Sequence, residues 1–174
     1  MNRATHSLVT RQMQRRIALA SSKPTRSTVD VARQRATRLT EAEISDTMAP
    51  HHLAAQRLRE GVATEKEHTV FLTMVLVALA IEESGLIRGM RLHLEGAKSA
   101  LQAIADRAQV DGAWRPGVLY FYELEAIDTA LWLHTEQLRR LAWIELHNIT
   151  RKFLARHQSA GGQVEHISLK EVLS

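Results

Sequence analysis

The sequence predicts an all-α protein, a helical bundle of four to five main helices that follows a basic, flexible N-terminal arm. Only three prolines and eight glycines interrupt 174 residues, and alanine and leucine are abundant. Aromatic residues make up 5% of the chain, which disfavours strands because strands favour aromatic and β-branched side chains. Apolar residues also recur three or four positions apart in several segments, as in amphipathic helices.

Charge divides the chain unevenly. Residues 1–40 carry nine arginine and lysine side chains and one acid, a net charge of +8. Residues 41–174 carry fourteen basic and eighteen acidic side chains, a net charge of −4. We therefore expect a basic arm at 1–39, a helical bundle domain at 40–160 and a C-terminal tail at 161–174.

Helix signals begin at Thr40. Thr40 and Glu43 have the spacing of a capping box, in which each side chain bonds the backbone of the other residue. Pro50 predicts that this helix ends or kinks and that a second begins, to be stopped by Gly61. Two short helices within 41–60 could form a helix-turn-helix pair.

A second capping box, Thr64 and Glu67, opens the most apolar helix. It contains TVFLTMVLVALAI, thirteen uncharged residues at 69–81. At 1.5 Å per residue this run covers about 20 Å, whereas the hydrocarbon layer of a membrane is about 30 Å thick. The sequence therefore predicts no membrane span and a core helix surrounded by neighbours.

Gly85 is expected to end this helix, because the apolar stripe changes phase there. The next helix has a regular stripe at Ile87, Met90, Leu94, Ala97, Leu101, Ile104 and Ala108. Residues 110–117 read as a loop, and Pro116 suits the first position of the following helix. That helix has a stripe at Tyr120, Leu124, Ile127, Leu131, His134, Leu138 and Leu141. The phase shifts near 142–143, and a last helix is expected to reach about Gln158.

One spacing is typical of metal sites. Glu65 and His68 form a Glu-x-x-His pair, which di-iron bundles use twice together with two further glutamates. Glu123 or Glu125, with His93 or Glu95, could supply partners, but the pair occurs once. We interpret Glu65 as a first-turn residue and His134 as a core histidine, and we expect no metal and no cofactor. A metal- or ligand-binding bundle remains the second alternative.

Enzyme motifs are lacking. The chain has no cysteine, which excludes thiol catalysis and cysteine-ligated metals. No phosphate-binding glycine-rich loop, nucleophile elbow or zinc-protease motif is present. The sequence therefore predicts a protein that is not an enzyme.

The basic arm supports the first functional hypothesis, a small accessory or regulatory protein that contacts DNA or RNA. Arginine forks pair well with phosphates. The expected contacts are Arg11, Arg15, Arg16, Lys23, Arg26, Arg33, Arg35 and Arg38. Arginine outnumbers lysine 18 to 5, which favours a bacterial or mobile-element origin. The lack of cysteine fits a reducing compartment, and we expect a cytoplasmic location. A mitochondrial presequence over 1–28 is an alternative interpretation of the same composition.

The rival hypothesis is a protein–protein adaptor or inhibitor, which could also self-associate as a homodimer. Its contact surface would be the stripe from Ile87 to Ala108 or the aromatic start of the helix at 118–141. The candidate partner-interface residues are Trp114, Tyr120 and Tyr122.

Overall fold

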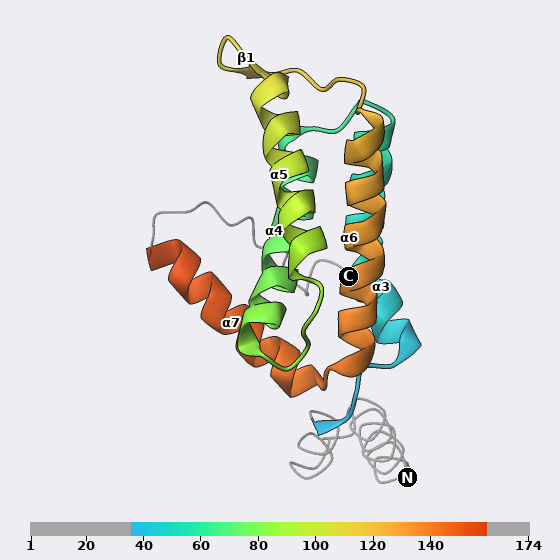
Figure 1. Cartoon of the computed structure of the whole chain (residues 1–174), viewed down its shortest axis with the longest axis vertical. Coiled ribbons are helices and arrows are strands. Elements are labelled where there is room, and N and C mark those ends of the chain that lie inside the picture. The colour runs from blue at the N-terminus through green and yellow to red at the C-terminus, as the bar shows by residue number, and fades with distance from the viewer. Residues whose placement is uncertain (1–35, 160–174) are drawn as a thin grey trace, which may run out of the picture. The chain divides into compact units, whose positions relative to one another are not determined.

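The computed structural model describes residues 36–159 and is a helical bundle, which confirms the predicted fold class (Figure 1). Its helices are α3 (Glu41–Arg59), α4 (Glu65–Ser84), α5 (Arg91–Ala108), α6 (Phe121–Arg140) and α7 (Trp143–Ser159). Within residues 36–159 the only strands are β1 (Gln109–Val110) and β2 (Ala113–Trp114), which form a small antiparallel hairpin. Most of the predicted arm and the C-terminal tail lie outside the described residues.

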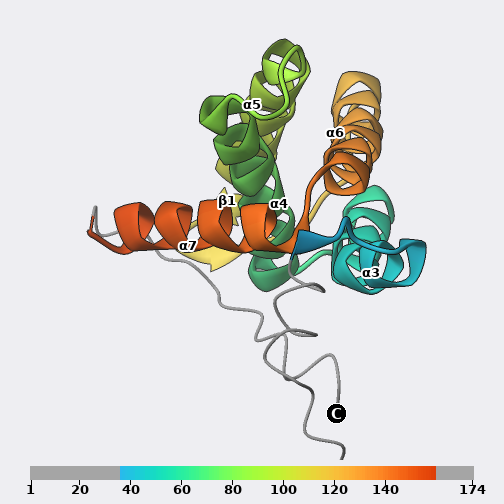
Figure 2. The ribbon, with the colours of Figure 1, turned by 90° about the horizontal axis from the view of Figure 1, so that it is seen from below.

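Helices α3 to α6 form an antiparallel four-helix bundle. Each helix packs against the next along the chain, and α6 returns to pack against α3. Helix α7 crosses one end of this bundle and packs on α4 (Figure 2). Helix α4 therefore has contacts with all four other helices, as expected for a helix without a polar face.

The predicted starts of α3 and α4 and the predicted end of α4 are confirmed. In both capping boxes the threonine hydroxyl accepts the glutamate amide while the carboxylate accepts the threonine amide, at 2.8 Å for Thr40 and 2.7 Å for Thr64. These backbone hydrogen bonds lower the pKa of Glu43 and of Glu67. Gly85 ends α4 with a φ of 78°, in the left-handed region that glycine adopts without strain.

The predicted break at Pro50 is wrong, because α3 continues through it as one helix. Proline lacks an N–H, so the carbonyl of Asp46 loses one helical hydrogen bond. Both halves of α3 nevertheless bury apolar side chains in the bundle, and this packing outweighs the lost bond. The buried residues are Ile44, Met48, Ala54, Ala55 and Leu58. A helix-turn-helix pair within 41–60 is thereby excluded.

Helix α6 begins at Phe121 and not at Pro116, so that prediction is also wrong. The start is set by Glu123, whose carboxylate accepts the N–H of Tyr120 at 2.8 Å. Tyr120 consequently precedes the helix and is exposed, although it belongs to the predicted apolar stripe. The later stripe positions, from Ile127 to Leu141, are buried as predicted.

The core is centred on α4. Phe71, Val75, Ala78 and Ile81 are all completely buried. Leu72, Leu76 and Val77 are half-buried and pack against the core from the opposite side. The 69–81 segment is thus the structural centre that its composition predicts. None of the helices within 36–159 has the length and apolar character needed to cross a membrane.

A carboxylate from α4 caps the start of α5. Met90, at the N-cap position of α5, provides no side-chain hydrogen bond. Glu82 Oε1 instead accepts three backbone N–H groups, from Gly89 at 2.7 Å, Met90 at 3.0 Å and Arg91 at 3.2 Å. A negative charge at a helix N-terminus is stabilising. The turn between α4 and α5 is therefore held by a residue seven to nine positions earlier in the sequence.

Buried His134 of α6 lies against half-buried His51 of α3. The Gln137 amide donates to the carbonyl of Ala78 at 3.0 Å, so its Oε1 faces the Nδ1 of His134 at 3.2 Å. Nδ1 of His134 must therefore carry the proton. The ring of His51 meets that of His134 edge to face at 6.4 Å. Burial lowers the pKa of His134 to about 4, and burial together with the nearby His134 and His52 lowers that of His51 to about 3.

This pair predicts destabilisation by mild acid. Below about pH 6.5 the unfolded chain binds protons at His51 and His134 that the folded chain does not bind until the pH reaches these lower pKa values. Each histidine then lowers the free energy of unfolding by up to about 1.4 kcal/mol per pH unit. Urea unfolding at pH 7 and pH 5 measures the loss.

The His134→Asn variant should lose part of this pH dependence, because the asparagine amide can donate to Gln137 without titrating, whereas His51 and buried His68 remain. His147→Asn, at an exposed histidine of α7 outside the groove, is the control and should change the dependence less. If the free energy of unfolding depended equally on pH in the wild type and both variants, the assignment of this dependence to His134 would be contradicted.

Candidate protein-binding groove

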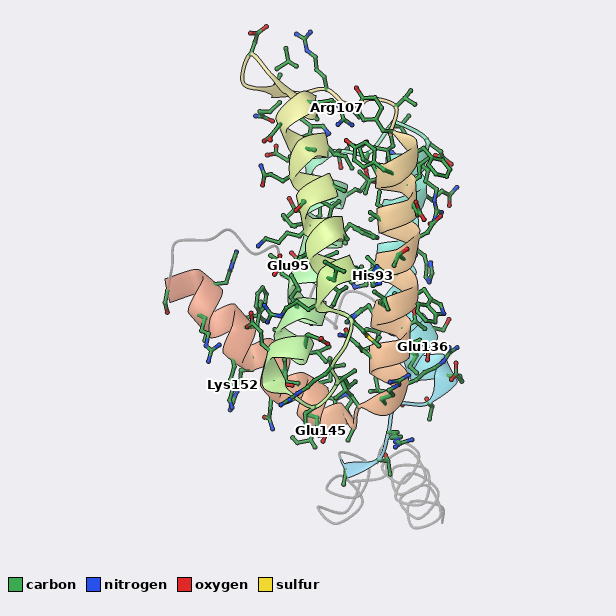
Figure 3. The ribbon with its side chains drawn as sticks, viewed as in Figure 1. His93, Glu95, Arg107, Glu136, Glu145 and Lys152 are labelled. Carbon is green, nitrogen blue, oxygen red and sulfur yellow. The ribbon has the colours of Figure 1, made fainter. Side chains whose placement is uncertain are left out.

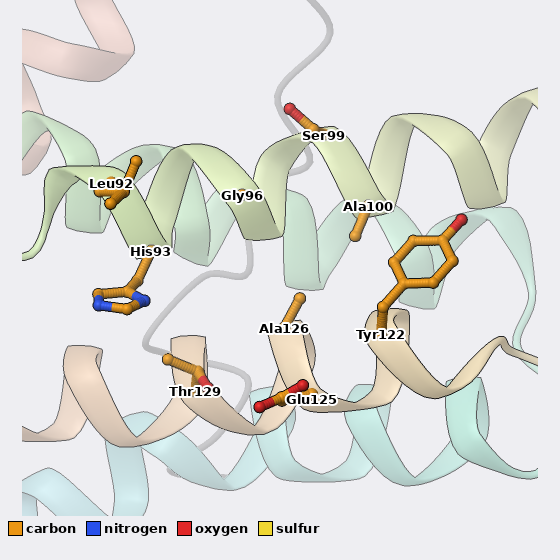
Figure 4. Close-up of a pocket in the computed structure, with 9 residues that line it drawn as sticks. All are labelled: Leu92, His93, Gly96, Ser99, Ala100, Tyr122, Glu125, Ala126 and Thr129. Atoms are coloured by element: carbon orange, nitrogen blue, oxygen red, sulfur yellow. The ribbon is translucent and has the colours of Figure 1, made fainter.

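A groove runs along the surface between α5 and α6 (Figure 4). It consists of two hollows, of about 440 Å³ and 660 Å³, that share His93 and Thr129. The first is lined by Leu92, His93, Gly96, Ser99, Ala100, Tyr122, Glu125, Ala126 and Thr129. The second is lined by Arg88, Gly89, Met90, His93, Asp128, Thr129, Trp132 and Leu133. We call the combined surface the α5–α6 groove.

Small residues form the floor of this groove. Gly96 and Ala100 lie one turn apart on α5, and Ala126 and Thr129 lie about one turn apart on α6. A Cβ atom at Gly96 would meet no other atom within 4 Å, so core packing does not require glycine there. The floor is therefore open to side chains from another molecule.

Large apolar side chains border the same groove. Leu92 is 81% exposed, Trp132 is 62% exposed and Tyr122 is 56% exposed. Phe121, adjacent to Tyr122, is also strongly exposed. A cluster of exposed apolar side chains around hollows is typical of a protein interaction site.

Most charges near the groove are paired within the chain. Asp128 is bonded to Arg59 of α3, and Glu95 lies within ion-pair distance of both Arg91 and Lys98. Arg88 and Glu125 differ from these, because neither has an ion pair with any residue in the 36–159 range. The guanidinium of Arg88 lies close to Gly85 at the end of α4. The groove thus holds one uncompensated charge of each sign.

An ion pair between a buried carboxylate and a partly exposed guanidinium fixes the aromatic end of the groove. Arg107 donates to both carboxylate oxygens of Glu123, at 2.6 Å and 2.7 Å, and Glu123 is completely buried while the Arg107 side chain is 36% exposed. Burial alone would raise the pKa of Glu123, but hydrogen bonds from Arg107 and from the Tyr120 amide lower it overall. Arg107 also lies 4.4 Å from the ring centre of Tyr120, which stacks on Tyr122 at 5.8 Å. This arrangement presents both tyrosines at the surface.

The three predicted interface residues occupy two different places. Tyr120 and Tyr122 are exposed together at the end of the groove. Trp114 is half-buried on the β hairpin, where its Nε1 donates to the carbonyl of Ala63 at 2.7 Å. Its ring also contacts that of His68, with centres 5.2 Å apart. Trp114 thus joins the hairpin to the bundle, while the tyrosines face solvent.

The Glu65–His68 spacing has a structural explanation. His68 is buried on α4, and its Nε2 lies 2.9 Å from the carbonyl oxygen of Leu101. Burial lowers its pKa, so the ring is neutral and donates this hydrogen bond. Glu65 is exposed in the first turn of the same helix. Across the part of the chain that the structure describes, no three histidine or acidic side chains are grouped so as to hold a metal.

Arg38 is the one predicted nucleic-acid contact inside the described range. It is exposed, and its backbone forms a bridge with Ala142 in the link between α6 and α7. The other seven predicted contacts lie outside that range, namely Arg11, Arg15, Arg16, Lys23, Arg26, Arg33 and Arg35.

The two contact surfaces expected for a protein partner differ in exposure. The stripe from Ile87 to Ala108 is buried in the bundle, whereas the aromatic start of α6 is exposed. Leu92 and Trp132 were not among the interface residues predicted from the sequence. Both are large apolar residues that do not fall on the buried stripe of their helix. A large apolar residue outside that stripe is the sequence signal that could have identified them.

Comparison of the chain with models of known protein families, with curated proteins and with solved structures found no match.

The Arg107→Ala variant should lower the free energy of unfolding by about 2 kcal/mol, because it removes two hydrogen bonds to a buried carboxylate, although water can reach the partly exposed site that it vacates. Urea unfolding measures the loss. The control is Arg139→Ala, which removes exposed ion pairs with Glu41 and Glu136 and should cost much less. Replacing both Arg107 and Glu123 by methionine should recover much of the stability. Similar losses in the two single variants would contradict this role.

Proposed function

We propose that this protein is a non-enzymatic helical interaction protein that binds a protein surface through the α5–α6 groove. The observation that carries the proposal is the exposure of Leu92, Tyr122 and Trp132 around hollows with small-residue floors. Hot spots of protein interfaces commonly combine an aromatic anchor with a well-formed pocket. An accessory or regulatory role follows naturally from such a surface.

The groove also suits a protein better than a small molecule. Its two hollows share His93 and Thr129 and follow one another along the two helices, and large exposed side chains line both of them. Small-molecule sites usually enclose most of the ligand surface. A partner that lays apolar side chains along the two helices would cover both hollows together.

Site-specific photo-crosslinking tests this function. A photo-reactive residue at position 92 should yield a discrete cross-linked protein species in cells, which mass spectrometry then identifies. The control is position 53, because Leu53 of α3 is also an exposed leucine, at 56%, and lies outside the groove. Trp132→Ala should reduce the cross-linked fraction about tenfold, as expected when an interface anchor is removed. Equal cross-linking from positions 92 and 53 would contradict the proposal.

A second candidate function, contact with DNA or RNA, is supported by a basic surface on α7. Arg151, Lys152 and Arg156 are exposed, and the only acid of this helix is Glu145 (Figure 3). The C-terminal part of α7 extends beyond the bundle in both ribbon views (Figures 1 and 2). These cations would add to those of the arm, and arginine-rich composition supports the proposed bacterial, cytoplasmic setting.

Fluorescence anisotropy with a labelled DNA duplex and a labelled RNA hairpin tests this candidate over a series of salt concentrations. Replacing Arg151, Lys152 and Arg156 by alanine should weaken binding and lower the salt slope by about three, if each cation contacts one phosphate. Alanine at Arg11, Arg15 and Arg16 measures the contribution of the arm. The control is Lys66→Ala with Lys98→Ala, at exposed cations on other helices. Salt-independent binding, or no binding, would refute nucleic-acid contact.

A further inference from the structure

The α5–α6 groove has features in a fixed order from one end to the other. Because α5 and α6 are antiparallel, Trp132 lies beside Gly89 and Met90 at one end. His93 and Thr129 occupy the middle and belong to both hollows. The hollow floored by Gly96 and Ala126 lies on the other side of this middle point. Trp132 and the floor formed by Gly96 and Ala126 therefore lie on opposite sides of His93.

This order makes the groove complementary to itself. In a two-fold symmetric pair the same patch faces its own copy in the opposite direction. An axis through the His93 region would place Trp132 of each copy over the small-residue hollow of the other. It would also bring exposed Leu86, at one end, towards Tyr122 at the other end.

The unpaired charges follow the same symmetry. Arg88 lines the hollow that holds Trp132, whereas Glu125 lines the hollow that holds Gly96. The two residues thus stand on opposite sides of the His93 region. An antiparallel pair would bring Arg88 of each copy towards Glu125 of the other, forming two equivalent ion pairs. The other acids near the groove, Glu95 and Asp128, already have partners within the chain.

We propose that the occupant of the α5–α6 groove is a second copy of this chain, paired antiparallel about an axis near His93, with reciprocal Arg88–Glu125 ion pairs. This inference rests on the proposed function, since it names the partner of the same groove. Trp132 is the apolar anchor of the pair, and Arg88 and Glu125 select the antiparallel direction. Each copy keeps α7 and its basic residues outside the interface.

Sedimentation equilibrium of the full-length protein over a range of concentrations tests the pairing. The expected result is a reversible dimer, at twice the chain mass of 19.6 kDa. Arg88→Glu and Glu125→Arg should each raise the dimer Kd at least about tenfold, because each creates two like-charge contacts. The double variant, Arg88→Glu with Glu125→Arg, should recover a Kd close to that of the wild type, because both ion pairs re-form with reversed signs.

Two further variants separate pairing from folding. Trp132→Ala should weaken the dimer, whereas Leu53→Glu on α3 should not, and circular dichroism should show unchanged helix content in both. A dimer that is insensitive to both charge reversals and to Trp132→Ala overturns the proposal, as does a double variant no better than the singles. A strictly monomeric wild-type chain also overturns it. If position 92 still cross-links a different protein in that case, the proposed interaction function stands and only the second-copy assignment falls.

Discussion

The burial of α4 is the constraint on which the rest of this structure depends. Its central residues are apolar around most of the helix circumference, and a single neighbour can cover only one side. Burying an aliphatic or aromatic side chain contributes about 1.5–3 kcal/mol, so leaving this helix uncovered would cost far more than any cap or ion pair supplies. The other four described helices provide the cover, and α7 does so by lying across α4.

The helices that surround α4 also have faces that do not contact it. Helices α5 and α6 each turn one face inward and need only small residues where they meet near the surface. The large apolar side chains that border this seam add nothing to the covering of α4. Our proposal explains their exposure by contact with another molecule.

The sequence predicted the fold well wherever local chemistry decides. The capping boxes at Thr40 and Thr64 and the stop at Gly85 are short-range devices, and all three hold. It failed at Pro50 and Pro116, because tertiary packing outweighed one lost hydrogen bond and because Glu123 sets the start of α6. The groove required knowing which faces of α5 and α6 meet each other. Only the three-dimensional arrangement provides that information. Leu92 and Trp132 were therefore not predicted from the sequence as interface residues, whereas Tyr122 was.

The hydrogen bond from Gln137 to the carbonyl of Ala78 has a consequence for the alignment of the bundle. Apolar packing alone tolerates sliding of one helix along another by a turn, because similar side chains recur at that interval. Sliding α6 along α4 would leave the buried Gln137 amide without its acceptor, at a cost of about 1–3 kcal/mol. The buried Gln137 amide therefore favours one alignment of α6 along α4. By holding α6 in register, it also fixes the heights of Glu125 and Trp132 on the outer surface.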